Sequence, residues 1–327
     1  MSAPTGALPA RRRGSAAVSV ARPRWLPRSR TARLAAATVA LGVVAYLGIS
    51  LKYAEGVTRV ERRPLVSTPA YVAPAHQDVS FRSTDGLLLR GWWFESPSPR
   101  GRAAVLVHGK DRNRIDSSFA PGRIARLLLS SGYGVLMFDL RGHGESEGLR
   151  WGLGQHEPKD ILGAVEFAAK SANVGRERVA LIGESMGGGS VLMTVGADPR
   201  IGPVVTDSAY ADARVVVDEV GPQYSGLPAA FTPGLILMSL LFFDLDISRI
   251  VPLDVVRAHP ERAFLFIQCE NDRTVARHHG EDLRRASANP RTQLWRAPDC
   301  GHVRSFIAHP AEWERRVLAF LEAELGR

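Results

Sequence analysis

One serine of this sequence is surrounded by glycines, in the stretch VALIGESMGGGS at residues 179–190. The apolar residues before it predict a strand, and the chain must turn at Ser185 into a helix expected from about residue 190. Such a turn crowds the backbone two residues before and after the serine, where Gly183 and Gly187 stand. The pattern G-x-S-x-G between a strand and a helix is typical of a catalytic nucleophile. A phosphate-binding loop fits less well, because this turn has neither Gly-Lys-Ser/Thr nor G-x-G-x-x-G.

A serine hydroxyl is a poor nucleophile unless a base removes its proton, and the base needs an acid that orients it. His302 is the expected base, because the loop DCGH follows the last predicted strand and can reach back toward Ser185. Asp272, in CENDR, directly follows the preceding strand, and its position favours it as the acid over Asp207 and Asp299. We expect ordinary surface or core roles for His278, His279 and His309.

Two backbone amides are expected to hold the negative charge that develops on a carbonyl oxygen under attack. The first belongs to Met186, at the start of the helix that follows the nucleophile. The second is the amide, not the ammonium, of Lys110, in the loop VHGKDRN. His108 in the same loop is expected to be a structural hydrogen-bonding residue. Arg141 and His143, in FDLRGHGESEG, are expected to support this rim of the sheet rather than to take part in catalysis.

Short apolar runs alternate with amphipathic stretches from residue 77 onward. The first two runs, 77–83 and 87–94, are separated by Asp85-Gly86, which is typical of a tight antiparallel hairpin. Further strands, separated by helical segments, are predicted at 103–109, 134–140, 179–185, 203–209, 263–272 and 292–299. This alternation predicts an α/β fold with a mostly parallel sheet and helices on both faces. Ligands bind such sheets at the carboxyl ends of the strands.

Six motifs together make the chain resemble the α/β-hydrolase superfamily, particularly single-domain serine hydrolases of the esterase, lysophospholipase and Bem46-like kind. They are HGK, FDLRGHGES, GESMGG, VTDSAY, ENDRTV and CGH, in this order within residues 77–325. The resemblance implies an eight-stranded sheet, an acyl-serine intermediate, and neither a metal nor an organic cofactor. Lys110 departs from the family pattern, in which a small residue or asparagine often follows His-Gly.

The positive charge of the chain is concentrated at its amino terminus. Residues 1–33 contain eight arginines and no acidic residue, and the rest of the chain is nearly neutral, so the charge does not indicate nucleic-acid binding. Residues 34–51 carry no charge and, as a helix, would extend about 27 Å, close to the thickness of a membrane core. We expect an uncleaved anchor with a basic cytoplasmic tail at 1–33 and the rest of the chain outside. A cleaved signal peptide and a buried core helix are the alternatives.

Two further segments accompany the predicted hydrolase domain at 77–327. Residues 52–76 contain three prolines and no helical period beyond Lys52, which predicts a linker between the membrane and the domain. Residues 211–260 interrupt the alternation of strands and helices and are expected to form a cap. Within the cap, residues 227–243 carry no charge. Buried packing, a lining for an acyl chain, and a surface that dips into the membrane are the possible uses of this run.

The only two cysteines of the chain lie near the expected acid and base. Cys269 precedes Asp272 by three residues, and Cys300 precedes His302 by two. If the two loops meet, a disulfide can join them, and two free buried thiols are equally compatible with the sequence.

The sequence therefore predicts a membrane-anchored serine hydrolase that cleaves carboxylic esters or thioesters. The expected partners are a small-molecule or lipid acyl ester and a membrane. The same residues also serve a peptidase or an acyltransferase. A non-catalytic protein with a hydrolase fold is a further alternative, for which a broken triad would be the sign.

Overall fold

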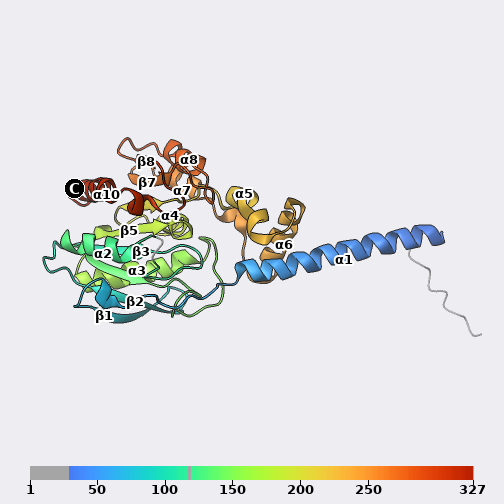
Figure 1. Cartoon of the computed structure of the whole chain (residues 1–327), viewed down its shortest axis with the longest axis horizontal. Coiled ribbons are helices and arrows are strands. Elements are labelled where there is room, and N and C mark those ends of the chain that lie inside the picture. Colours follow the sequence, from blue (N-terminus) through green and yellow to red (C-terminus); the bar gives the residue numbers. More distant parts are fainter. Residues whose placement is uncertain (1–28, 117–118, 327) are drawn as a thin grey trace, which may run out of the picture. The chain divides into compact units, whose positions relative to one another are not determined.

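The computed structural model describes residues 29–116 and 119–326, and its fold is dominated by one eight-stranded sheet (Figure 1). The chain separates into two units, residues 1–46 and residues 47–327. The sheet belongs to the second unit, and the order of its strands is β1-β2-β4-β3-β5-β6-β7-β8. Its strands are β1 (Gln77–Arg82), β2 (Leu88–Phe94), β3 (Ala103–Val107), β4 (Gly134–Phe138), β5 (Val179–Glu184), β6 (Val204–Asp207), β7 (Phe264–Cys269) and β8 (Gln293–Ala297).

The direction of the strands confirms the predicted α/β fold. The hairpin β1–β2 is antiparallel, β2 pairs antiparallel with β4, and every other neighbouring pair is parallel. The inner strands are apolar on both faces because both are covered. In β3, for example, Val105 packs into the core on one face, while Leu106 packs into the core on the other.

Two layers of helices cover the sheet. One face packs against α3 (Glu157–Ala172), α4 (Met186–Ala197), α7 (Pro252–Ala258) and α8 (His278–Ala286). The other packs against α2 (Pro121–Ser130), α9 (Ser305–Ala308) and α10 (Pro310–Leu325). The helix after the serine starts at Met186, four residues earlier than its apolar pattern indicated. Its second to fourth residues are glycines, which carry no periodic signal.

The insertion expected at about 211–260 lies between β6 and β7 and is helical. It contains α5 (Ala213–Ser225), α6 (Thr232–Phe243) and α7, with the short 3₁₀ turns η3 (Ala229–Phe231) and η4 (Ile247–Arg249). Asp212 begins α5 by accepting hydrogen bonds from the amides of Arg214 and Val215. Pro233 lies in the first turn of α6. Backbone N–H groups in the first turn have no acceptor within the helix, so the missing N–H of proline costs no hydrogen bond there. We call the part of this insertion that precedes α7, residues 211–251, the cap.

One helix, α1 (Arg30–Thr58), contains the uncharged run near the amino terminus. It is the one single helix in the described part of the chain that is long and apolar enough to cross a membrane, and a signal sequence would have the same features. The structure differs from the prediction at its carboxyl end, because the helix continues past Lys52 to Thr58. Lys52 therefore interrupts the apolar composition without ending the helix, since lysine is a good helix former.

The segment expected to be a linker, 52–76, is not a free tether. After α1 ends, residues 59–76 lie along the domain, with Val60 and Val72 buried. The guanidinium of Arg62 donates hydrogen bonds to the carbonyls of Gly144, Ser146 and Gly148. After Thr58 the one helical turn of this stretch is the 3₁₀ turn η1 (Pro69–Tyr71), which begins at a proline. Prolines disfavour an α-helix, but they do not prevent an irregular segment from packing.

Candidate active site

The turn between β5 and α4 holds Ser185 in a conformation that few residues adopt. Its φ of 49° and ψ of −118° lie outside the regions that ordinary residues populate. Its amide donates a hydrogen bond of 2.9 Å to the carbonyl of Asp207, which ties the turn to β6. A Cβ atom at Gly183 would lie 2.5 Å from the carbonyl oxygen of Gly187, and one at Gly187 only 2.3 Å from that of Val107. Both positions therefore require glycine, for the steric reason that the sequence suggested.

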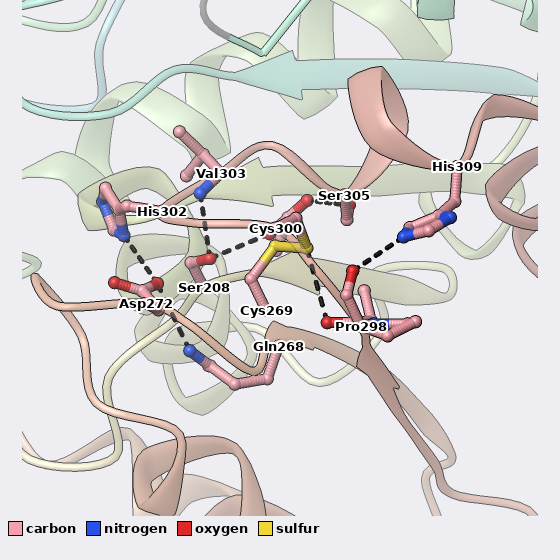
Figure 2. Close-up of a disulfide and its surroundings, with 12 residues drawn as sticks. Ser208, Gln268, Cys269, Asp272, Pro298, Cys300, His302, Val303, Ser305 and His309 are labelled. Carbon is pink, nitrogen blue, oxygen red and sulfur yellow. Dashed lines mark hydrogen bonds and ion pairs between the residues drawn. A yellow bond between two sulfur atoms is a disulfide. The ribbon is translucent and has the colours of Figure 1, made fainter.

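The structure brings His302 and Asp272 to this serine. His302 Nε2 lies 2.8 Å from Ser185 Oγ, and His302 Nδ1 lies 2.8 Å from Asp272 Oδ2, as Figure 2 shows for the second pair. The other oxygen of Asp272, Oδ1, accepts hydrogen bonds from the amides of Thr274 and Val275. Because this carboxylate accepts from Nδ1–H, the lone pair of Nε2 faces the serine hydroxyl. The arrangement can remove the proton of Ser185.

The alternative acids do not contact His302. Asp299 is exposed. Asp207 is buried beneath the site, where burial raises its pKa to about 6. It accepts hydrogen bonds from the hydroxyls of Ser208 and Ser305. Ser208 in turn accepts from the amide of Val303, so Asp207 supports the loop that carries His302 instead of the imidazole itself.

A disulfide joins Cys269 to Cys300, so the structure selects one of the two states that the sequence left open (Figure 2). Both residues are buried. The amide of Asn271 donates a hydrogen bond of 3.1 Å to the carbonyl of Cys300, beside the disulfide. The loops that carry Asp272 and His302 are thus held together by a covalent bond and by a backbone hydrogen bond.

The two expected oxyanion donors, the amides of Met186 and Lys110, have no hydrogen-bond partner among the described residues. Both residues line the same cavity as Ser185. The ammonium of Lys110 is directed elsewhere, because it pairs with Asp111 and lies 5.4 Å from the ring centroid of Trp151. A lysine is therefore compatible with the loop, although the family pattern favours a smaller residue there.

Two neutral imidazoles hold the Lys110 loop. His108 Nε2 accepts a hydrogen bond from the amide of Leu140, and His143 Nε2 accepts one from the amide of Asp111. Burial lowers the pKa of both rings, so each keeps the lone pair that it needs as an acceptor. Arg141 forms ion pairs with Asp160 and Asp85 and does not line the cavity.

Sequence reasoning did not single out Glu184, the residue between Gly183 and Ser185. Its Oε1 accepts a hydrogen bond of 3.0 Å from the amide of Gly109, and its Oε2 has no partner among the described residues. Burial raises the pKa of this carboxyl to about 8. Glu184 therefore connects the nucleophile turn to the oxyanion loop. The available signal was a carboxyl group at the end of an otherwise apolar strand.

A cavity of about 580 Å³ opens above Ser185 and His302. Its far walls come from the cap and from the carboxyl end of α1, and most of the side chains there are apolar. The residues of these walls include Val57, Val216, Val220, Leu235, Ile236 and Ser239. A more open depression of about 750 Å³ between β1, α3 and α4 contains none of the residues around Ser185.

One cluster outside this site has side chains that bind metals in other proteins. His278 Nε2 and His279 Nε2 lie 2.7 Å and 3.2 Å from the carboxylate oxygens of Glu219. His279 Nδ1, however, accepts a hydrogen bond from the amide of Ala211, so its proton is on Nε2, which faces Glu219. As arranged, the cluster is a set of hydrogen bonds between α5 and α8.

Comparisons with known proteins place the chain among hydrolase-like sequences and structures. Residues 99–240 match the family model described as "Serine aminopeptidase, S33". The uncharacterized protein YfhR of Salmonella typhi is 27% identical over 261 residues, covering 76% of this chain and 82% of the relative. The uncharacterized protein Rv2307c of Mycobacterium tuberculosis is 34% identical over 122 residues, covering 37% and 42% of the two chains.

Among solved structures, the esterase Pf2001 of Pyrococcus furiosus has a TM-score of 0.67, with 24% identity over 81% of this chain and 99% of the esterase. The hypothetical protein PA2218 of Pseudomonas aeruginosa has a TM-score of 0.60, with 22% identity and coverage of 80% and 99%. Together with the eight-stranded sheet, these likenesses show that the chain has the α/β-hydrolase fold.

Proposed function

We propose that this protein is a serine hydrolase that cleaves carboxylic esters or thioesters of acyl groups. The observation that carries the proposal is the continuous hydrogen-bonded chain from Ser185 through His302 to Asp272. The apolar walls of the cavity above it suit an acyl group better than a charged substrate. The fold and the family match support hydrolase activity in general, and the substrate class rests on the site itself.

The reaction follows from the positions of the atoms. Ser185 Oγ attacks the carbonyl carbon while its proton passes to His302 Nε2, and the carbonyl oxygen takes the negative charge beside the amides of Met186 and Lys110. His302 then gives the proton to the leaving alcohol or thiol, which leaves an acyl group on Ser185. Water attacks this acyl group with His302 again as the base, and the free acid is released. Asp272 holds the imidazole in the required tautomer throughout.

A fluorophosphonate probe and p-nitrophenyl esters test the proposal together. In the wild type the probe is expected to modify Ser185, and Ser185→Ala should lose probe labelling and about 10⁴-fold or more of the turnover. Ser248→Ala, which changes an exposed serine of the cap, is the matched control and should keep both. Undiminished ester hydrolysis by a folded Ser185→Ala variant would overturn the assignment.

The matched family model supports aminopeptidase activity as a second candidate. The same three side chains can cleave amides, and Glu61 and Asp111 line the cavity where an acidic group could bind a substrate amine. Turnover of aminoacyl p-nitroanilides at rates comparable to those of the esters would favour this alternative.

We further propose that α1 is an uncleaved single-pass anchor with the arginine-rich terminus in the cytoplasm and the hydrolase domain outside. The orientation follows from the arginines before the uncharged run, and a disulfide in the domain fits an oxidising compartment. The arginine-rich residues up to 28 lie outside the described part of the chain. Protease protection of an amino-terminal tag, but not of the domain, in intact spheroplasts is the expected result.

A further inference from the structure

The cap helix α6 exposes an unusual amount of apolar surface. No charged residue occurs between Glu219 and Asp244. On α6 four large apolar side chains are between 43% and 62% exposed, namely Leu237, Leu240, Leu241 and Phe242. We call these four residues the α6 apolar face. Leu237, Leu240 and Leu241 are spaced i, i+3 and i+4 and share one side of the helix, and Phe242 is exposed near its end. Exposed apolar residues gathered in this way mark a surface that is covered by a partner or by lipid.

The side of α6 that is opposite Leu237, Leu240 and Leu241 packs against the carboxyl part of α1. Leu235 and Met238 of α6 form a small core with Ala54, and Leu47 and Leu51 pack against the same cluster. Leu47 and Leu51 belong to the uncharged run of α1, just before Lys52. Because a helix rises by about 1.5 Å per residue, α6 lies beside the last turns of the apolar run, where a spanning helix leaves the hydrocarbon.

The composition of the cap agrees with a position of α6 at the surface of the membrane. The segments Ala213–Ser225 and Ala229–Phe243 together are as apolar as a membrane span, but they are bent against each other by 118°. A bent apolar pair of this kind is found in broken spans and in segments that dip into one leaflet. One side of α6 is packed on residues 47–54 of α1, which leaves the α6 apolar face exposed.

The same helix also forms part of the cavity above Ser185. Leu235, Ile236 and Ser239 of α6 line the cavity, and so do Gly56 and Val57 of α1. One helix therefore has an apolar side toward the candidate site and a second apolar side toward the surroundings. An acyl chain can pass from bilayer to cavity along such a helix without complete exposure to water.

We propose that the α6 apolar face docks on the phospholipid bilayer that holds α1, and that the substrate is an acyl ester of a lipid resident in that bilayer. The second part rests on the proposed hydrolase function of Ser185. Docking of the α6 apolar face does not depend on it and is measured separately.

Docking is tested by site-specific labelling of the full chain in phospholipid nanodiscs. Both native cysteines are in the disulfide, so Leu241→Cys introduces a unique free thiol for an environment-sensitive fluorophore. The matched control is Ala319→Cys, an exposed position of α10, which lies at the other end of the domain from α6 (Figure 1). We expect doxyl-labelled lipids to quench the label at 241 at least threefold more strongly than the label at 319, and aqueous iodide to show the reverse order.

Two outcomes of this experiment would overturn the docking proposal. Equal quenching at both positions would mean that α6 faces water. Protection of position 241 from iodide without quenching by the doxyl lipids would mean that a second protein copy covers the face.

The substrate class is tested with two esters in the same nanodiscs, a water-soluble p-nitrophenyl butyrate and a phospholipid with a fluorescent acyl ester. The triple variant Leu237→Gln, Leu241→Gln, Phe242→Gln should hydrolyse the soluble ester within twofold of the wild-type rate. It should hydrolyse the bilayer ester at least tenfold more slowly. Val66→Gln, which changes a residue that is 67% exposed outside the cap, should change neither rate.

Unchanged hydrolysis of the bilayer ester by the triple variant, or no hydrolysis of that ester by the wild type, contradicts the lipid substrate. Failure of the proposed function gives a different result. In that case Ser185→Ala hydrolyses the soluble ester as fast as the wild type, whatever the labels at 241 and 319 report.

Discussion

The rim of the sheet and the cap are held in place by different forces. At the rim, Asp272, His302 and Ser185 are fixed by hydrogen bonds, and a disulfide joins the loops of the first two. In the cap, α6 is held mainly by apolar contacts, and one of its sides remains exposed. Hydrogen bonds fix the direction of atoms, whereas apolar contacts mainly require a suitable volume. The comparison implies that the rim determines the reaction and the cap determines which acyl groups enter.

The strongest test of the rim compares its two buried aspartates. Asp272→Asn should lower kcat by about 10³- to 10⁴-fold, because an amide no longer holds His302 in the tautomer that accepts the serine proton. Asp207→Asn should lower kcat less than about tenfold, because Asp207 contacts serine hydroxyls and not the imidazole. The kcat for ester hydrolysis is measured on the two purified variants. Equal losses of kcat would contradict the assignment of Asp272 as the acid of the triad and of Asp207 as a supporting residue.

The disulfide provides the next test. Replacing both Cys269 and Cys300 by serine should lower the free energy of unfolding by about 3–4 kcal/mol, since the bond closes a loop with a sequence separation of 31. The kcat should fall a few-fold, because the loops of Asp272 and His302 lose a constraint. Denaturant titration and ester kinetics measure the two effects. A variant as stable as the wild type would show that the surrounding packing alone holds these loops.

A cap substitution should change specificity and leave the chemistry intact. Ile236→Trp enlarges a side chain in the wall of the cavity and should lower kcat/KM for octanoate relative to acetate by about tenfold, or about 1.4 kcal/mol. Ile236→Ala is the matched control and should not reduce this ratio. A series of p-nitrophenyl esters of increasing chain length measures it. Equal losses for short and long esters would indicate that the cap also positions the reacting groups.

The smallest expected effect concerns Glu184 and pH. Because the folded-state pKa of this carboxyl is raised to about 8, the folded protein keeps a proton that the unfolded chain loses above about pH 4.5. The stability of the wild type should therefore fall relative to Glu184→Gln as the pH rises from about 4.5 to 8, and should level off above. We expect a difference on the order of 1 kcal/mol, because local relaxation reduces the effect of burial. Denaturant titrations of both proteins at several pH values measure this difference. If the free energies of unfolding of the two proteins change in parallel with pH, the raised pKa of Glu184 is contradicted.

Much of the fold was predictable because its signals are local. Apolar runs of strand length separated by amphipathic stretches gave the eight strands near their observed positions, and Asp85-Gly86 marked the hairpin. The end of α1 and the path of residues 59–76 were not predicted correctly. Their structure depends on partners far along the chain, such as the carbonyls that bind Arg62.

For the candidate site, the sequence by itself determined the turn at Ser185 and the strand ends that carry Asp272 and His302. A parallel sheet brings the carboxyl ends of its strands to one edge whatever the loops contain, so the order of elements was sufficient to place these residues near one another. Only the tertiary structure decided that Glu184 binds the amide of Gly109, that the two cysteines are joined, and that α6 and α1 share a wall of the cavity. These contacts join residues that no local period or motif relates, so they depend on how the loops and the cap pack in three dimensions.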